Sequence, residues 1–164
     1  MFDKEIVCCF TGHREIPPER RGQITELLVS AVDKLVERGC LCFMTGGALG
    51  FDTLAAEAVL SARKRNPQIR LTLVLPCMTQ AKGWSAADAA VYDEIKSECD
   101  STVYTSEEYT RGCMFRRNRY LVDNSGICVA YMTVDKGGTA YTVRYALKKR
   151  LEVINIAQNV GTEM

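Results

Sequence analysis

The sequence predicts an α/β fold, a three-layer sandwich in which helices cover both faces of a mostly parallel central sheet of about six strands. Short apolar runs alternate with longer segments whose apolar residues recur at helical spacing. This alternation indicates parallel strands, because each helix returns the chain to the same edge of the sheet. The strands are expected at Glu5–Phe10, Leu41–Met44, Ile69–Leu75, Thr102–Tyr104, Ile127–Met132 and Val153–Ala157.

The first strand and the first helix show this pattern most clearly. The run that ends at Phe10 is apolar, which suits a strand buried on both faces. Pro17-Pro18 then opens a helix whose apolar residues form one stripe, as expected for a helix packed on a sheet. Gly39 is suited to end that helix as its C-cap residue.

The next two helices have recognisable boundaries. The second helix is expected to stop before Asn66-Pro67, because proline disfavours helical backbone at the preceding residue. The longest irregular stretch, residues 77–83, follows the third strand. Ser85 then starts a third helix, with Asp88 placed as in a capping box.

Two further helices complete the expected fold. A basic helix over Met114–Asp123 follows the loop Thr105–Gly112, and the last helix is expected over Thr139–Lys149. The chain of 164 residues fits one domain, which we predict over residues 1–164.

Composition and charge narrow the classes of function. The net charge is +1, so no overall field favours nucleic acid or a membrane surface. No apolar run approaches the roughly 20 residues of a spanning helix, and the N-terminus lacks a signal-peptide pattern. The cysteines lie mainly in apolar runs and are expected to be reduced core residues, not metal ligands or disulfides. We expect a cytoplasmic protein with a small-molecule ligand and with neither a membrane nor a nucleic-acid partner.

The loops at the carboxyl ends of the strands are the expected site. In an open parallel sheet these loops meet at one edge, and ligands bind near the point where the strand order reverses. Thr11-Gly12-His13-Arg14 is the loop after the first strand, and we include all four residues in the ligand site. His13 is the only histidine, and either a structural role or ligand contact would explain it.

A glycine-rich run, residues 46–50, follows the second strand and leads into a helix. Bare backbone N–H groups at a helix N-terminus suit a phosphate or a sugar, although a tight turn with positive φ would also need glycine. Asp52 either complements the helix dipole or binds a ribose hydroxyl. The residues expected to bind the ligand here are Gly46, Gly47, Ala48, Gly50 and Asp52.

A second glycine pair, Gly137-Gly138, precedes the last helix, with Thr139 as its expected N-cap and as a hydroxyl donor to phosphate. Arg117 lies on the apolar stripe of the basic helix, so its guanidinium needs either a buried carboxylate or a ligand anion. We expect the anion, with Asn118 at the same site. On this hypothesis Arg117→Ala weakens nucleotide binding without unfolding the protein.

Taken together, these motifs resemble the YpsA-like family of the SLOG superfamily, which joins the DNA-processing protein DprA and the LOG phosphoribohydrolases. The resemblance covers nearly the whole chain and implies a Rossmann-like fold and a pocket for a nucleotide or an ADP-ribose-like ligand. It also makes a homodimer plausible. The motifs that carry it are Thr11 to Arg14, Gly46 to Asp52, Cys113 to Arg119 and Gly137 to Thr142.

The resemblance to the LOG enzymes is incomplete at the residues needed for catalysis. Asn118 stands where their helix motif has lysine, and Arg144 holds the position of their essential glutamate. A guanidinium cannot stabilise positive charge on a ribosyl centre, so LOG-type hydrolysis would need Asp52 or Glu57 instead.

Three functions follow from the sequence. The first is binding or sensing of a nucleotide derivative. The second is hydrolysis of the N-glycosidic bond of a nucleoside monophosphate, and the third is DprA-like binding of single-stranded nucleic acid through the arginine-rich helix.

Overall fold

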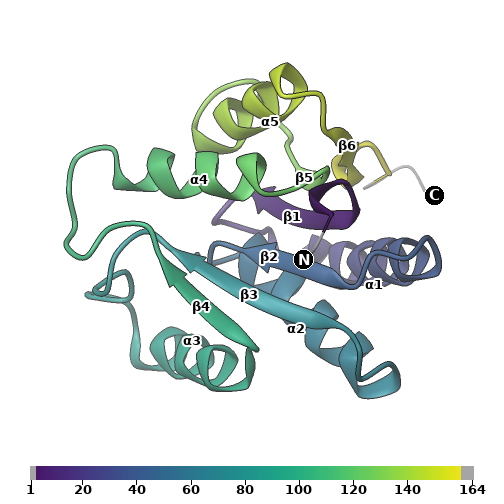
Figure 1. Cartoon of the computed structure of the whole chain (residues 1–164). Helices are drawn as coiled ribbons and strands as arrows, with labels where there is room; N and C mark the ends of the chain where they lie inside the picture. Colours follow the sequence, from purple (N-terminus) through teal and green to yellow (C-terminus); the bar gives the residue numbers. More distant parts are fainter. Residues whose placement is uncertain (1–2, 160–164) are drawn as a thin grey trace.

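The computed structural model describes residues 3–159, which form a three-layer α/β sandwich (Figure 1). The strands are β1 (Val7–Gly12), β2 (Cys42–Thr45), β3 (Arg70–Leu75), β4 (Ser101–Tyr104), β5 (Ile127–Tyr131) and β6 (Glu152–Asn155). They form one sheet in the order β4-β3-β2-β1-β5-β6, and every pairing is parallel. The predicted fold class is therefore confirmed, while both ends of the domain predicted over 1–164 lie outside the described residues.

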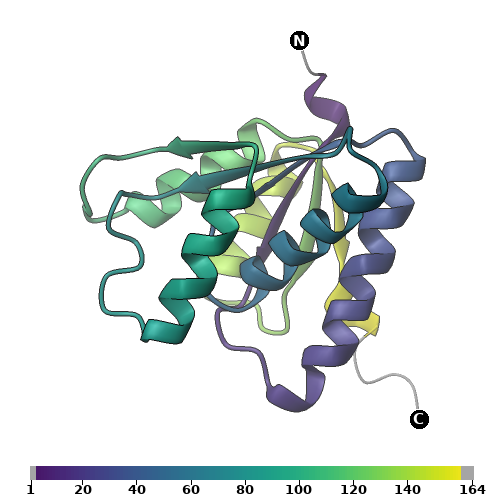
Figure 2. The same cartoon turned by 90° about the horizontal axis from the view of Figure 1, so that it is seen from below.

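Helices cover the sheet on both faces. The helices are α1 (Arg21–Glu37), α2 (Phe51–Arg65), α3 (Ala86–Glu98), α4 (Cys113–Asp123) and α5 (Gly138–Lys148). Figure 1 shows α4 and α5 on one side of the sheet and α1 to α3 on the other, and Figure 2 shows the second group from below. Within the described residues, none of the helices combines the length and the apolar character needed to cross a membrane.

The strand order reverses at β1. Strands β2, β3 and β4 extend the sheet from one side of β1, whereas β5 and β6 extend it from the other. Gly12, the last residue of β1, pairs with Tyr131, the last residue of β5. The loops that follow these two strands therefore open next to each other, at the switch point where doubly wound folds bind ligands.

Two buried clusters hold the layers together. One lies between the sheet and the helices α1 to α3 and contains Phe10, Phe43 and Phe51, and the other lies under α4 and α5. Neighbouring residues of a strand point to opposite faces, so Cys8 belongs to the first cluster and Cys9 to the second. The interpretation of these cysteines as core residues is confirmed by their burial.

Some predicted boundaries were wrong at the residues that matter for the site. Thr11 and Gly12 are the end of β1 and not a loop, because both pair with β5. At the other loop, α5 begins at Gly138 and its N-cap is Gly137, so Thr139 lies in the first turn and is not the N-cap. A short 3-10 turn at Pro18–Arg20 precedes α1.

Candidate functional site

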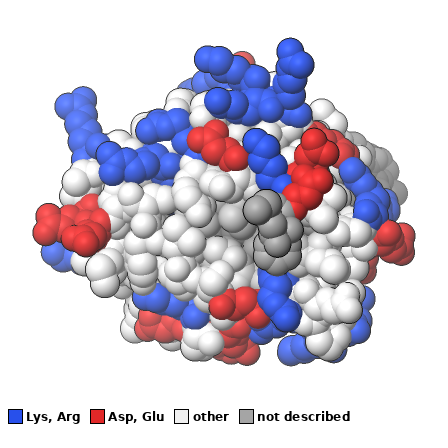
Figure 3. All heavy atoms as spheres, in the orientation of Figure 1, with Lys and Arg blue, Asp and Glu red and all other residues white. Residues whose placement is uncertain are grey.

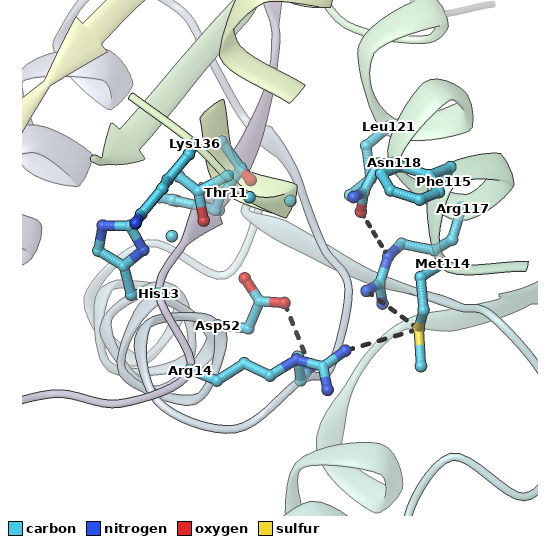
Figure 4. Close-up of a pocket in the computed structure, with 16 residues that line it drawn as sticks. Thr11, His13, Arg14, Asp52, Met114, Phe115, Arg117, Asn118, Leu121 and Lys136 are labelled. Carbon is cyan, nitrogen blue, oxygen red and sulfur yellow. Dashed lines mark hydrogen bonds between the residues drawn. The ribbon is translucent and has the colours of Figure 1, made fainter. Parts of the chain in front are cut away.

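A pocket of about 260 Å³ opens at the switch point, between the loops after β1 and β5 and the first turns of α4 and α5. Figure 4 shows Asp52 near its centre, with His13 and Lys136 on one side and Arg14, Met114 and Arg117 on the other. The lining residues are Phe10, Thr11, Gly12, His13, Arg14, Ala48, Asp52, Met114, Phe115, Arg117, Asn118, Leu121, Lys136, Gly137, Gly138 and Thr139.

The structure brings together most of the predicted site residues. Eleven of them line this pocket, from four separate segments of the chain. They are Thr11, Gly12, His13, Arg14, Ala48, Asp52, Arg117, Asn118, Gly137, Gly138 and Thr139. The three exceptions are the glycines of the first run, Gly46, Gly47 and Gly50, which do not line the pocket.

These three glycines serve contacts inside the protein. A Cβ on Gly46 would overlap the guanidinium of Arg117, and a Cβ on Gly50 would overlap the backbone carbonyl of Arg14. Gly47 and Gly50 also have positive φ values of 68° and 76°, in the region that favours glycine. The backbone of residues 46–50 is therefore shaped by close internal packing and by its turn, and its glycines do not form the wall of a ligand cradle.

Asp52 occupies one of the backbone donors that the first glycine-rich run could offer to an anion. Its Oδ2 accepts a hydrogen bond from the Ala48 backbone N–H at 3.2 Å. Burial raises the pKa of Asp52, and the nearby positive charges of Arg117 and Arg14 act in the opposite direction. Asp52 thus places a carboxylate in the pocket, and a phosphate at Ala48 would have to compete with it.

Arg117 is buried, with only 4% of its surface exposed. Its Nη1 donates to the carbonyl oxygen of Gly46, and its Nε donates to Oδ1 of Asn118 at 2.8 Å. Nη1 also lies 3.4 Å from Oε1 of Gln80. Neutral oxygens therefore accept several of the hydrogen bonds that the guanidinium can donate. The sequence predicted a buried carboxylate or a ligand anion as its partner, and the carboxylate of Asp52 acts on the guanidinium only by longer-range electrostatic attraction.

His13 joins the two loops of the switch point. Its Nε2 accepts a hydrogen bond from the Thr133 backbone N–H at 2.9 Å, and its ring meets Tyr131 edge-on. Burial lowers the pKa of His13. Because an imidazolium has no acceptor nitrogen, the bond to Thr133 requires the neutral ring.

The second glycine pair faces the opening of the pocket. Gly137 has a φ of 90°, and a Cβ on either Gly137 or Gly138 would meet nothing within 4 Å. No side chain caps the N-terminus of α5. The exposed side chain of Lys136 precedes this helix end, and the guanidinium of Arg14 lies across the pocket (Figure 4), where it donates to Sδ of Met114 at 3.6 Å.

Several residues of the site were not predicted from the sequence. Lys136 and Phe115 line the pocket. The sequence signal for Lys136 was its position next to Gly137, and that for Phe115 was its place in the arginine-rich motif. Gln80 lies in the irregular stretch after β3, and its Nε2 donates to the carbonyl oxygens of Gly46 and Gly47 at 3.3 Å each. No sequence pattern pointed to Gln80, because its role depends on a loop that packs back onto another loop.

Two of the residues that bear on LOG-type catalysis, Arg144 and Glu57, lie outside this pocket. Arg144 is exposed and pairs with Asp135 at 2.8 Å, and Glu57 lies in a separate groove between α2 and α3. Asp52 is therefore the carboxylate that lines the pocket. Within residues 3–159, no group of three or more His, Cys, Asp and Glu side chains is placed to hold a metal ion.

The fold and the pocket define a doubly wound α/β protein with its cavity at the switch point of a parallel sheet. Residues 17–159 match the YpsA family model, described as the YspA SLOG family, and the chain belongs to this family. Its resemblance to the SLOG superfamily is therefore confirmed.

Curated relatives give no reaction. An uncharacterized SPbeta prophage-derived protein, YoqJ of Bacillus subtilis (strain 168), is 28% identical over 142 residues, which are 79% of this chain and 83% of YoqJ. The UPF0398 protein BH1768 of Halalkalibacterium halodurans is 30% identical over 119 residues, 71% of this chain and 63% of that protein.

Solved structures support the fold. The single-stranded-DNA-binding DNA processing protein A of Helicobacter pylori superposes with a TM-score of 0.64 at 20% identity, over 92% of this chain and 64% of that one. The structure of TM1055 superposes with a TM-score of 0.57 at 16% identity, over 90% of this chain and 71% of that one. This chain spans less than two thirds of the Helicobacter protein, and the likeness concerns the fold alone.

Proposed function

We propose that the pocket binds a nucleotide derivative through its phosphate, with binding or sensing as the function. The observation that carries this proposal is the uncapped N-terminus of α5, which opens into the pocket at Gly137 and Gly138. Backbone N–H groups at a helix N-terminus bind phosphate well, and glycine lets them come close to it. Lys136 adds positive charge beside this helix end, and Arg14 adds it from the other side of the pocket.

The remaining walls suit the rest of a nucleotide. Asp52 offers carboxylate oxygens to sugar hydroxyls, and the ring of Phe115, 42% exposed, offers an apolar surface at the pocket edge. The cavity of about 260 Å³ is near the small end of the usual range for ligand sites, about 300–1,000 Å³. A ligand of nucleoside monophosphate size or a part of a larger nucleotide fits this space best.

A calorimetric titration with AMP, ADP-ribose and NAD tests the proposal. The variant Lys136→Ala should weaken binding about tenfold, which corresponds to about 1.4 kcal/mol. Lys64→Ala is the matched control, because Lys64 is an exposed lysine in the last turn of α2 and does not line this pocket. If no nucleotide binds, or if both variants lose the same affinity, the pocket is not the nucleotide site.

A second candidate, hydrolysis of the N-glycosidic bond of a nucleoside monophosphate, is favoured by one observation. Asp52 is a buried carboxylate in the pocket with a raised pKa, as is common for groups that handle protons or positive charge in catalysis. Release of free base from AMP, followed by chromatography, tests this activity. Asp52→Asn should abolish release and Glu57→Gln should not. Release that survives in Asp52→Asn would exclude Asp52 as the catalytic group.

A further inference from the structure

We propose that the face formed by α4, α5 and the neighbouring edge of β4 binds single-stranded nucleic acid, independently of the pocket. The charge of the chain is strongly uneven along the sequence. Residues 111–150 contain nine Lys and Arg and two Asp, a net charge of +7, so the other residues together carry −6. The overall charge of +1 hides this division, which gives one part of the molecule a strongly positive field.

The positive charges on this face are largely free of acidic partners. Arg116 donates to the hydroxyl of Ser106 at 3.0 Å, and Arg119 donates to the hydroxyl of Tyr141 at 3.1 Å, both neutral groups. Among the described side chains of residues 111–150, the one ion pair is Arg144 with Asp135. Figure 3 shows Lys and Arg side chains gathered over α5 and along α4.

A groove of about 430 Å³ runs between α4 and the end of β4. It is lined by Arg116, Arg119 and Tyr120, with Asp123 as its acidic lining residue. Single strands are bound by this combination, in which cations hold the phosphates and aromatic rings stack on the bases. The ring of Tyr104 packs on the opposite face of the sheet, beside Lys96 of α3.

Further aromatic rings lie on the other side of α4. The hydroxyl of Tyr141 accepts the hydrogen bond from Arg119, and the Tyr141 ring stacks parallel to that of Tyr145 with centroids 6.4 Å apart. Tyr145 follows on α5, with the ammonium of Lys149 5.5 Å from its ring centroid. Arg116 and Arg119 therefore lie between Tyr120 in the groove and the rings of Tyr141 and Tyr145 on α5. This arrangement favours a single strand over a duplex, because base pairing and stacking hide the faces of the bases.

Fluorescence anisotropy with a labelled oligothymidylate of about 20 nucleotides tests this proposal. A strand of this length is long enough to extend beyond the groove at β4 and over the rest of the proposed face. Affinity should fall steeply between about 50 and about 200 mM salt. The variant Arg116→Gln/Arg119→Gln should lose at least about tenfold in affinity, and its salt slope should fall by about 1.4, the value for two phosphate contacts on a single strand. A control, Arg21→Gln/Lys64→Gln, removes the same charge from the exposed surface of α1 and α2 and should bind as the parent does.

Three further measurements make the test specific. An equimolar duplex should bind more weakly than the single strand, excess AMP should not displace the strand, and vesicles with anionic lipid should not bind through the same arginines. The proposal is overturned if no strand binds at low salt, if the control loses as much affinity as the variant, or if AMP competes. It is also overturned if the duplex binds as tightly, or if vesicles are bound and the strand is not. Arg119→Gln removes a hydrogen bond to Tyr141 and could unfold the double variant. In that case Arg116→Gln/Lys148→Gln replaces Arg116→Gln/Arg119→Gln, because the side chains of Arg116 and Lys148 are exposed.

Discussion

The guanidinium of Arg117 lies against the backbone of Gly46, whose carbonyl oxygen accepts a hydrogen bond from Nη1. A Cβ on Gly46 would overlap the same guanidinium. The absence of a side chain at Gly46 therefore makes room for an arginine of the protein itself. This pair links the loop after β2 to α4 beneath the floor of the pocket, and it makes both residues parts of the scaffold.

Replacing Gly46 by alanine should destabilise the protein by about 2 kcal/mol, the usual cost of overpacking a buried position. Thermal unfolding followed by circular dichroism measures this loss. Gly22→Ala is the control, since a Cβ there would meet nothing within 4 Å and Gly22 lies in α1. That change should leave stability equal or raise it by up to about 1 kcal/mol. Equal melting temperatures for Gly46→Ala and the parent would contradict the packing described here.

Removing the Arg117 side chain should cost about 3 kcal/mol, because it leaves a cavity and deprives the Gly46 carbonyl of a buried donor. This outcome differs from the prediction made from the sequence, in which Arg117→Ala affects ligand binding alone. Urea unfolding measures the change. The neighbouring exposed residue gives a control, and Arg116→Ala should stay within about 0.5 kcal/mol of the parent. If the two alanine variants are equally stable, Arg117 has no structural role.

Gly138→Ala should behave in the opposite way to Gly46→Ala. A Cβ at Gly138 would enter open space, so the fold should keep its stability. The same Cβ would stand at the open N-terminus of α5, where we propose that phosphate binds, and should reduce nucleotide affinity about tenfold. Titration calorimetry and thermal unfolding of the same sample separate the two effects. A loss of stability with unchanged affinity would reverse the roles assigned to the two glycine pairs.

The stability of the protein should depend on His13 at mildly acidic pH. Burial lowers the pKa of His13 from 6.5, so the folded state favours the neutral ring that accepts from Thr133. This contribution is present above the unfolded pKa of 6.5 and is lost as the pH falls through the lower folded value. Melting temperatures of the parent and of His13→Gln across this range should converge as the pH falls. A constant difference between them would show that titration of His13 does not contribute.

Strand and helix periodicity was enough to predict the sheet, because buried parallel strands and amphipathic helices leave clear patterns. The gathering of loops around Thr11 and Gly138 also followed, since parallel strands present their carboxyl ends together. The roles of the two glycine pairs did not follow. Glycine is required both where a ligand approaches and where another residue packs, and only the position of Arg117 decided between these at Gly46.

The partners of buried polar side chains were also beyond the sequence. The apolar stripe of α4 indicated that Arg117 needs a partner, and the structure supplies Gly46, Asn118 and Gln80 in place of one charged group. Backbone carbonyls and loop amides carry no sequence signature of such a role. The concentration of positive charge over residues 111–150 was visible in the sequence, and the net charge of the whole chain concealed it.

The position of β5 beside β1 has a consequence for how the chain is made. β1 ends at Gly12, and its neighbour on the pocket side begins at Ile127. On the ribosome, one edge of β1 therefore stays unpaired until the chain has been made as far as β5. Such long-range pairing is slow and leaves an exposed strand edge meanwhile. The pocket itself cannot form until α5 has emerged, so the loop after β1 is made long before the elements that enclose it.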